Sequence, residues 1–140
     1  MRITQTAWQQ IVDHARSDSP IEACGYLAAE DDVIVEAIRL RNADASPEHF
    51  SFDPAEQFST LRAIRKKGRK LLAVYHSHPA SPARPSQEDI RLAFDPALSY
   101  VIASLAAEAP VVKSFRIRNG EVTPDVIEVL EAGTEDHRVV

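Results

Sequence analysis

The sequence predicts a single α/β domain in which helices pack around a mixed central β-sheet. Three observations lead to this prediction. The chain has 140 residues, the ordinary length of one domain. Amphipathic, helix-like segments alternate with short apolar runs that are typical of strands. No repeat, linker or low-complexity segment interrupts that order. We therefore expect one domain over residues 1–130 and a tail without regular structure over residues 131–140.

The first part of the chain predicts a helix followed by a β-hairpin. A helix is predicted to run to about Ser17, because an apolar stripe recurs there at helical spacing. Thr6 can cap its start. The stripe consists of Trp8, Ile11, Val12 and Ala15. Segment 21–30 predicts a strand buried on both faces, since small and apolar residues occupy its consecutive positions. A pair of aspartates then signals a turn into a second strand, 33–40.

A second helix is predicted to begin at Asp53 and to end near Gly68. Asp53 would cap it, Pro54 would occupy the first helical position, and Glu56 lies three residues after the cap, as in a capping box. The preceding segment, 41–49, is polar and is predicted to be a loop. The aromatic residues of this region are expected to join the core rather than form a substrate platform: Phe50, Phe52 and Phe58.

The second half of the chain predicts a strand, a third helix and three more strands. The apolar run 71–77 is typical of a buried strand. Ser86 signals the start of a helix over 87–94, with Phe94 facing inward. The later strands are predicted at 100–106, 111–118 and 121–129. The last two are joined by an Asn-Gly pair, which is a strong hairpin signal.

Composition and charge exclude several classes of partner. The formal net charge is -5, so no nucleic-acid partner is expected. The single cysteine, Cys24, excludes an internal disulfide framework and a cysteine-based zinc site. The first residues lack the apolar run of a signal peptide, and no segment approaches the ~20 apolar residues of a membrane span. We therefore expect a cytoplasmic protein with no membrane partner.

The stretch HSHPASPARPSQED, residues 76–89, holds the candidate ligands of a metal ion. His76 and His78 are separated by one residue at the end of a predicted strand, so both imidazoles point to the same side. Asp89, in the first turn of the next helix, would add an oxygen ligand. Three protein ligands leave a fourth tetrahedral position open for water, as in catalytic zinc sites. The water then needs a proton acceptor, usually a carboxylate that does not bind the metal.

A purely structural role stays open for some of these residues. Ser86 and Asp89 have the spacing of an N-cap residue and its N3 partner, so helix capping alone can explain both. Capping and metal binding are compatible, because a capped helix directs its first-turn side chains toward the preceding loop. The two histidines alone leave a metal site and a metal-free site equally open. Their combination with Asp89 favours the metal.

The motif resembles that of the JAMM (MPN+) zinc metalloproteases. His76-x-His78, seven residues, Ser86, two residues and Asp89 match the pattern of that family without a gap or a substitution. The family also requires a glutamate on the strand after the first helix, and Glu22 in PIEACG is similar to that segment. The resemblance covers nearly the whole chain. It implies the JAMM/MPN fold, which is cytidine-deaminase-like.

The resemblance also implies a role for each of these residues. His76, His78 and Asp89 would bind one Zn²⁺ per chain. Glu22 would act as general base and then protonate the leaving amine. Ser86 would donate a hydrogen bond to the oxyanion of the reaction.

A class of substrate follows from the same resemblance. Family members cleave peptide or isopeptide bonds after the C-terminal Gly-Gly of ubiquitin or ubiquitin-like proteins, and short prokaryotic members are associated with sulfur-carrier proteins. This chain lacks the insertions with which larger members grip ubiquitin chains, and its loop 41–51 is short. A small carrier with a Gly-Gly tail is therefore the expected partner. Such tails often add a strand to a sheet edge. The sequence specifies neither the carrier nor the oligomeric state.

Other functions stay open on the sequence. A non-catalytic MPN protein-binding module would keep the fold, although such members usually lose metal ligands that are all present here. A RadC-like protein of uncertain activity would carry a similar stretch. A zinc nucleoside deaminase needs a cysteine pair that this chain lacks. Cys24 has no evident group to activate it as a nucleophile, so a buried apolar role is expected. The remaining histidines are expected on the surface: His14, His49 and His137.

Overall fold

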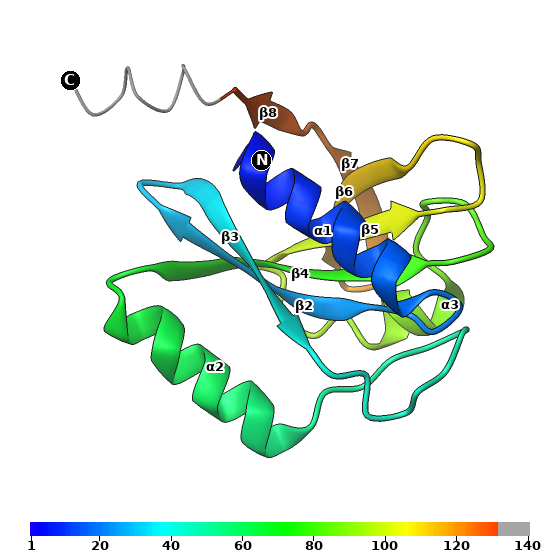
Figure 1. Ribbon diagram of the computed structural model, residues 1–140, viewed down its shortest axis with the longest axis horizontal. Coiled ribbons are helices and arrows are strands. Elements are labelled where there is room, and N and C mark those ends of the chain that lie inside the picture. Colours follow the sequence, from blue (N-terminus) through cyan, green and yellow to red (C-terminus); the bar gives the residue numbers. More distant parts are fainter. Residues whose placement is uncertain (132–140) are drawn as a thin grey trace.

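In residues 1–131, which the computed structural model describes, eight strands form one mixed sheet with three helices packed on it (Figure 1). The elements are β1 (Arg2–Thr4), α1 (Gln5–Asp18), β2 (Cys24–Glu30), β3 (Val33–Leu40), α2 (Pro54–Lys66), β4 (Lys70–His78), α3 (Gln87–Arg91), β5 (Ser99–Ser104), β6 (Val111–Arg118), β7 (Glu121–Asp125) and β8 (Glu128–Leu130). This arrangement confirms the predicted mixed α/β class. Apart from Glu131, the predicted tail 131–140 lies outside the described residues.

The sheet has the strand order β7-β6-β5-β4-β2-β3-β1-β8. β2 and β3 form the predicted antiparallel hairpin, and β2 also pairs with β4, so that Cys24 lies opposite His76. β4 and β5 run parallel. β4 is therefore an interior strand, hydrogen-bonded on both sides, and its end is held firmly in place.

The two faces of the sheet are covered by different helices (Figure 1). The main core cluster lies under α1 and includes Ile11, Leu27 and Tyr75. On the opposite face, one cluster under α2 surrounds Tyr26, and another beside α3 surrounds Ile102. Because side chains alternate along a strand, Tyr75 faces α1 while its neighbours in sequence face the α2 and α3 side.

The helix starts are set by side-chain caps. α1 begins earlier than predicted, because the cap is Thr4 rather than Thr6: the Thr4 hydroxyl accepts a hydrogen bond from the Ala7 N–H at 3.1 Å. α2 begins as predicted, with Asp53 accepting from the Glu56 N–H. The Glu56 carboxylate does not complete a capping box, however. It accepts a hydrogen bond from the Arg41 N–H at 2.8 Å instead.

Several predicted boundaries were wrong for reasons of tertiary structure. β1 was not predicted, since three residues are too few to show a period. The predicted strand 121–129 is two strands, β7 beside β6 and β8 beside β1 at the other end of the sheet. α3 ends at Arg91, and Phe94 is 81% exposed instead of facing inward. Phe58, on α2, is 64% exposed and does not join the core.

We predict that Gly25→Ala is strongly destabilising. A Cβ on Gly25 would overlap the Ile38 carbonyl oxygen and the Tyr75 ring, and neither can move without disturbing the centre of the sheet. The expected loss in the free energy of unfolding is about 3 kcal/mol. Chemical denaturation should show it.

Gly120→Ala is the control for this substitution. An added Cβ there meets nothing within 4 Å, although the positive φ of +78° carries some strain. This variant should lose only about 1 kcal/mol. Equal losses at the two positions would contradict the overlap at Gly25.

Candidate metal centre

Two histidines project from the end of β4 toward one point, as the sequence predicted. His76 and His78 lie on the same face of the strand, and their Nε2 atoms are 3.1 Å apart. Both residues are only 5% exposed. The histidines therefore present two nitrogen atoms at a shielded position on the α2 and α3 side of the sheet.

The start of α3 adds a carboxylate to this pair. Ser86 caps the helix: its Oγ accepts a hydrogen bond from the Asp89 N–H at 3.0 Å. Asp89 reciprocates, since its Oδ2 accepts from the Ser86 N–H at 2.9 Å. The same Oδ2 lies 3.2 Å from the Nε2 of His76 and 3.1 Å from that of His78. Capping therefore orients the carboxylate oxygen that faces the histidines.

These three atoms form a donor set that suits one metal ion. The Nδ1 of His78 lies 2.9 Å from the Pro82 carbonyl oxygen, which can only accept, so Nδ1 carries the proton and Nε2 presents a lone pair. Within residues 1–131, the side chains of His76, His78 and Asp89 bring one potential ligand atom each to within 4.8 Å of the other two. In a tetrahedral zinc site with metal–ligand distances of ~2.0–2.1 Å, the ligand atoms lie roughly 3.3 Å apart, which is close to the distances between these three atoms.

Without a cation, protons must hold the three groups together. Burial opposes ionisation of Asp89, but hydrogen bonds from His76 and His78 outweigh it and hold the pKa of Asp89 below its usual range. For His78, burial disfavours the charged form, yet the hydrogen bond to Asp89 prevails and raises its pKa. A divalent ion would replace these protons, because metal ligands bind in their deprotonated forms.

Glu22 lies beside this cluster and is not a member of it. The predicted strand 21–30 begins only at Cys24, so Glu22 belongs to the connection after α1. The residue next to it, Ala23, donates to the Ser77 Oγ at 2.8 Å, and the Ser77 N–H donates back to the Ala23 carbonyl at 2.9 Å. These two bonds hold Glu22 next to the segment of β4 that carries both histidines.

The carboxylate of Glu22 has an unusual environment. It is 3% exposed, and among the described residues its Oε1 is a buried polar atom with no hydrogen-bond partner. Burial raises the pKa of Glu22 from 4.5 to about 8, with His78 acting in the opposite direction. A buried, unpaired oxygen is costly unless a ligand or water uses it. The Oε1 of Glu22 is therefore available to a ligand or water that binds beside the cluster.

Asn42 holds the backbone around Glu22, and the sequence did not single it out. Its amide donates to the carbonyl oxygens of Glu22 at 3.1 Å and His49 at 2.9 Å. Its own oxygen accepts from the Asp44 N–H at 3.0 Å. The hydrogen bond from the Asp44 N–H closes an Asx turn, which an asparagine in a polar loop commonly forms. The sequence can indicate such a turn, but it cannot show that the asparagine also binds the Glu22 carbonyl.

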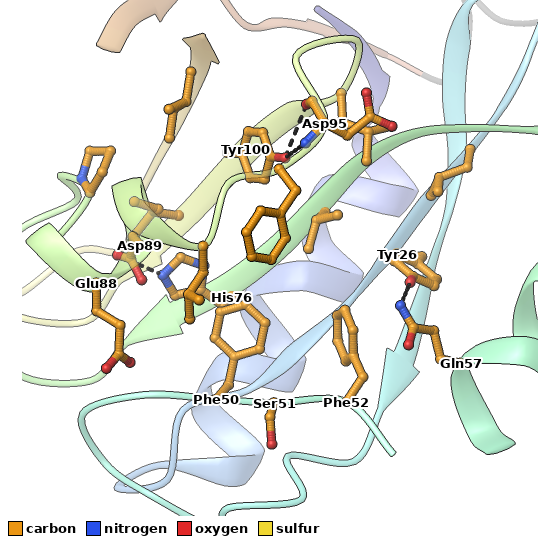
Figure 2. Close-up of a pocket in the computed structure, with 18 residues that line it drawn as sticks. Tyr26, Phe50, Ser51, Phe52, Gln57, His76, Glu88, Asp89, Asp95 and Tyr100 are labelled. Carbon is orange, nitrogen blue, oxygen red and sulfur yellow. Dashed lines mark hydrogen bonds and ion pairs between the residues drawn. The ribbon is translucent and has the colours of Figure 1, made fainter. Parts of the chain in front are cut away.

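A pocket of about 370 Å³ opens at the cluster and runs along the same face of the sheet (Figure 2). His76 and Asp89 lie at one end of it. Its walls come from the loop before α2, from α3 and from β4 and β5. The large side chains of the lining are mostly apolar: Phe50, Phe52, Val74, Leu92, Phe94, Leu98 and Tyr100. Of the three phenylalanines expected in the core, Phe52 packs against the cluster under α2, whereas Phe50 stacks on His76.

Some other residues differ from their predicted surroundings. His14 is 2% exposed rather than on the surface, and its Nδ1 lies 2.7 Å from the Tyr75 hydroxyl. His49 is exposed as expected, beside Asp44, and His137 lies outside the described residues. Cys24 is buried, and burial raises the pKa of its thiol to about 12, which disfavours a nucleophilic thiolate.

No helix within residues 1–131 is long and apolar enough to cross a membrane.

Comparison with known proteins identifies a matching family and named relatives. The family of prokaryotic homologs of the JAB domain matches residues 4–118. A protein of Mycobacterium tuberculosis named CysO-cysteine peptidase is 37% identical over 124 residues, which cover 86% of this chain and 85% of that protein. A desampylase of Haloferax volcanii is 35% identical over 111 residues, covering 74% of this chain and 80% of the relative.

Solved structures match over almost the whole chain. The solution structure of a protein from Desulfitobacterium hafniense is 46% identical and has a TM-score of 0.84, covering 93% of this chain and 92% of that one. The crystal structure of a JAB1/MPN domain protein from Archaeoglobus fulgidus is 26% identical with a TM-score of 0.63, covering 94% and 100% of the two chains. The fold predicted from the motif is confirmed.

We predict that Glu22 makes the metal-free protein less stable as the pH rises. Its raised pKa means that the protonated form is favoured in the folded state. The stability that it contributes is therefore complete below pH 4.5 and is lost as the pH rises through about 8. The free energy of unfolding of Glu22→Gln, relative to wild type, should rise by roughly 2–4 kcal/mol between pH 5 and pH 8.

Denaturation in the presence of a chelator at the two pH values would measure this difference. Adding a divalent metal should shrink it, because a nearby cation favours the charged carboxylate. A difference that stays constant with pH would show that Glu22 titrates normally.

Proposed function

This chain belongs to the family of prokaryotic homologs of the JAB domain, and on that premise we propose that it is a zinc-dependent peptidase. It would cleave the bond after the C-terminal Gly-Gly of a ubiquitin-like or sulfur-carrier protein. The observation that carries the proposal is the three-atom donor set of His76, His78 and Asp89 with a buried, unpaired carboxylate beside it. Relatives named CysO-cysteine peptidase and desampylase support the class of reaction.

His76, His78 and Asp89 would hold one zinc ion. Two imidazoles and one carboxylate suit zinc better than the hard ions magnesium and calcium, which prefer oxygen ligands alone. When bound, zinc would polarise the scissile carbonyl and lower the pKa of an attacking water. Because the protein would supply only three ligands, the fourth coordination position of the zinc would stay open for water or the substrate carbonyl.

Glu22 would move the proton of the reaction. Its Oε1 has no partner in the described structure, so it is free to accept the proton of the attacking water. It can then deliver this proton to the leaving amine. Burial, which raises its pKa in the metal-free protein, favours acceptance of the proton, whereas a bound cation would keep the carboxylate ionised before the reaction and favour release of the proton afterwards.

Ser86 would stabilise the oxyanion. Its Oγ accepts a hydrogen bond from the Asp89 N–H, which leaves the hydroxyl proton available to donate to a substrate oxygen. Because the helix cap fixes this oxygen beside Asp89, the hydroxyl is placed before substrate binds, and such preorganised donors are the effective ones.

The pocket beside the cluster is the best candidate for the substrate tail. A tail cannot add a strand to β4, because β2 and β5 already pair with it. The sheet ends at β7 and β8, and β7 is three strands from β4, roughly 14 Å at ~4.8 Å per strand. Two glycines carry no side chains, so the apolar walls would contact the residues that precede them.

We predict that a small carrier bearing a C-terminal extension is cut after its second glycine. Mass spectrometry of the purified protein incubated with Gly-Gly-tailed carriers should show this product. A chelator should abolish cleavage, and zinc should restore it. A protein that holds one zinc per chain and cuts no carrier would favour the non-catalytic binding module.

Two variants separate metal binding from proton transfer. Glu22→Gln should keep its zinc and lose at least about 100-fold in kcat, because it removes the general base. His78→Ala should lose the zinc itself. Metal analysis together with cleavage assays would test both. Full activity in Glu22→Gln, or normal zinc content in His78→Ala, would contradict the assignments.

The pocket predicts an effect on substrate affinity. Phe94→Ala should raise KM about 5- to 10-fold with little change in kcat, since it removes an apolar contact to the tail and no reacting group. Phe58→Ala is the matched control. It removes another exposed phenylalanine that does not line the pocket, and it should leave both constants unchanged. Equal effects would exclude the pocket as the binding site.

A further inference from the structure

The two histidines of the cluster are held in different ways. The outer bond of a histidine side chain rotates easily, so each ring needs something to fix its orientation. In metal sites the second ring nitrogen usually donates to an acceptor that does this. His78 follows the rule, because its Nδ1 donates to the Pro82 carbonyl at 2.9 Å. Among the described residues, none accepts a hydrogen bond from the Nδ1 of His76.

An aromatic ring instead covers one face of the His76 imidazole. The ring of Phe50 stacks on the imidazole of His76, with 4.7 Å between the ring centres and 29° between the planes (Figure 2). His76 is almost fully buried, so the contact occurs away from bulk water. A flat ring against one face of the imidazole limits its rotation and leaves the Nε2 directed at His78 and Asp89.

Phe50 is itself held firmly. It contacts Phe52 at a distance of 5.5 Å between ring centres, and Phe52 contacts Tyr26 at 5.1 Å. The neighbouring backbone is tied down too, since the Ala43 N–H donates to the Ser51 carbonyl at 2.9 Å. The position of Phe50 is thus set before any ligand binds, as effective positioning requires.

We propose that Phe50 is a positioning residue for the metal ligand His76. The proposal rests on the metal site assigned above. Phe50 keeps the imidazole in the orientation that binds metal. Its ring face, which carries partial negative charge, also favours the imidazole more once a cation withdraws electrons from it. Phe50 thus restrains the His76 ring by stacking, as the Pro82 carbonyl restrains the His78 ring by a hydrogen bond.

The experiment measures zinc affinity without any substrate. Zinc would be titrated against a chromophoric chelator in wild type, Phe50→Leu, Phe50→Tyr and Phe52→Leu. Phe50→Leu should weaken zinc binding about tenfold, the lower end of the effect seen when the outer partner of a metal ligand is removed. Phe50→Tyr keeps the ring and should stay within about twofold of wild type. Cobalt substitution should show a changed visible spectrum only in Phe50→Leu.

Phe52→Leu is the matched control. It removes an aromatic ring from the same loop and the same pocket wall, but this ring does not contact His76. Leucine keeps an apolar side chain against Phe50, so the position of Phe50 should be retained. The zinc affinity of this variant should stay within about twofold of wild type, and its cobalt spectrum should be unchanged. Thermal unfolding of the metal-free variants would establish that each is folded.

The outcomes separate this proposal from the proposed function. Equal zinc affinity in Phe50→Leu and Phe52→Leu would overturn the role of Phe50 and leave the peptidase untouched. Weak binding in Phe50→Tyr, equal to that in Phe50→Leu, would also overturn it. A wild-type protein that binds no zinc would overturn both the metal site and this inference.

Discussion

The site depends on three lone pairs that the fold directs to one point. The Nε2 atoms of His76 and His78 and the Oδ2 of Asp89 lie 3.1–3.2 Å from one another, which is unfavourable unless protons or a cation lie between them. The pairing of β4 on both sides and the reciprocal cap at the start of α3 hold them there. The candidate metal site is thus built from two rigid elements joined by a short loop.

The same sheet places the carboxylate of Glu22, the proposed general base. Glu22 stands just before β2, and the bonds between Ala23 and Ser77 bring it next to the histidines. Asn42 ties its carbonyl to the loop that follows β3. The fold leaves one carboxylate oxygen buried and without a partner, and this arrangement costs stability in the metal-free protein. An oxygen held at such a cost suits the proton transfer proposed for Glu22.

One loop contacts the candidate metal ligands, Glu22 and the proposed substrate pocket. The segment 41–53 carries Asn42, which holds Glu22, and Phe50, which covers His76. Phe50 and Phe52 also form a wall of the pocket. A change at Phe50 is therefore expected to affect metal binding and substrate binding together, although this segment contains none of the candidate ligands and not Glu22.

The sequence by itself determined the local features. The spacing of His76, His78, Ser86 and Asp89 predicted both the cap and the ligand set, because a strand and the first turn of a helix orient side chains through short-range geometry. Only the tertiary structure decided which distant groups meet them. The contact of Phe50 with His76, the hold of Asn42 on Glu22, the burial of His14 and the division of 121–129 between two ends of the sheet depend on packing between segments far apart in the chain. Periodicity within one segment carries no information about such contacts.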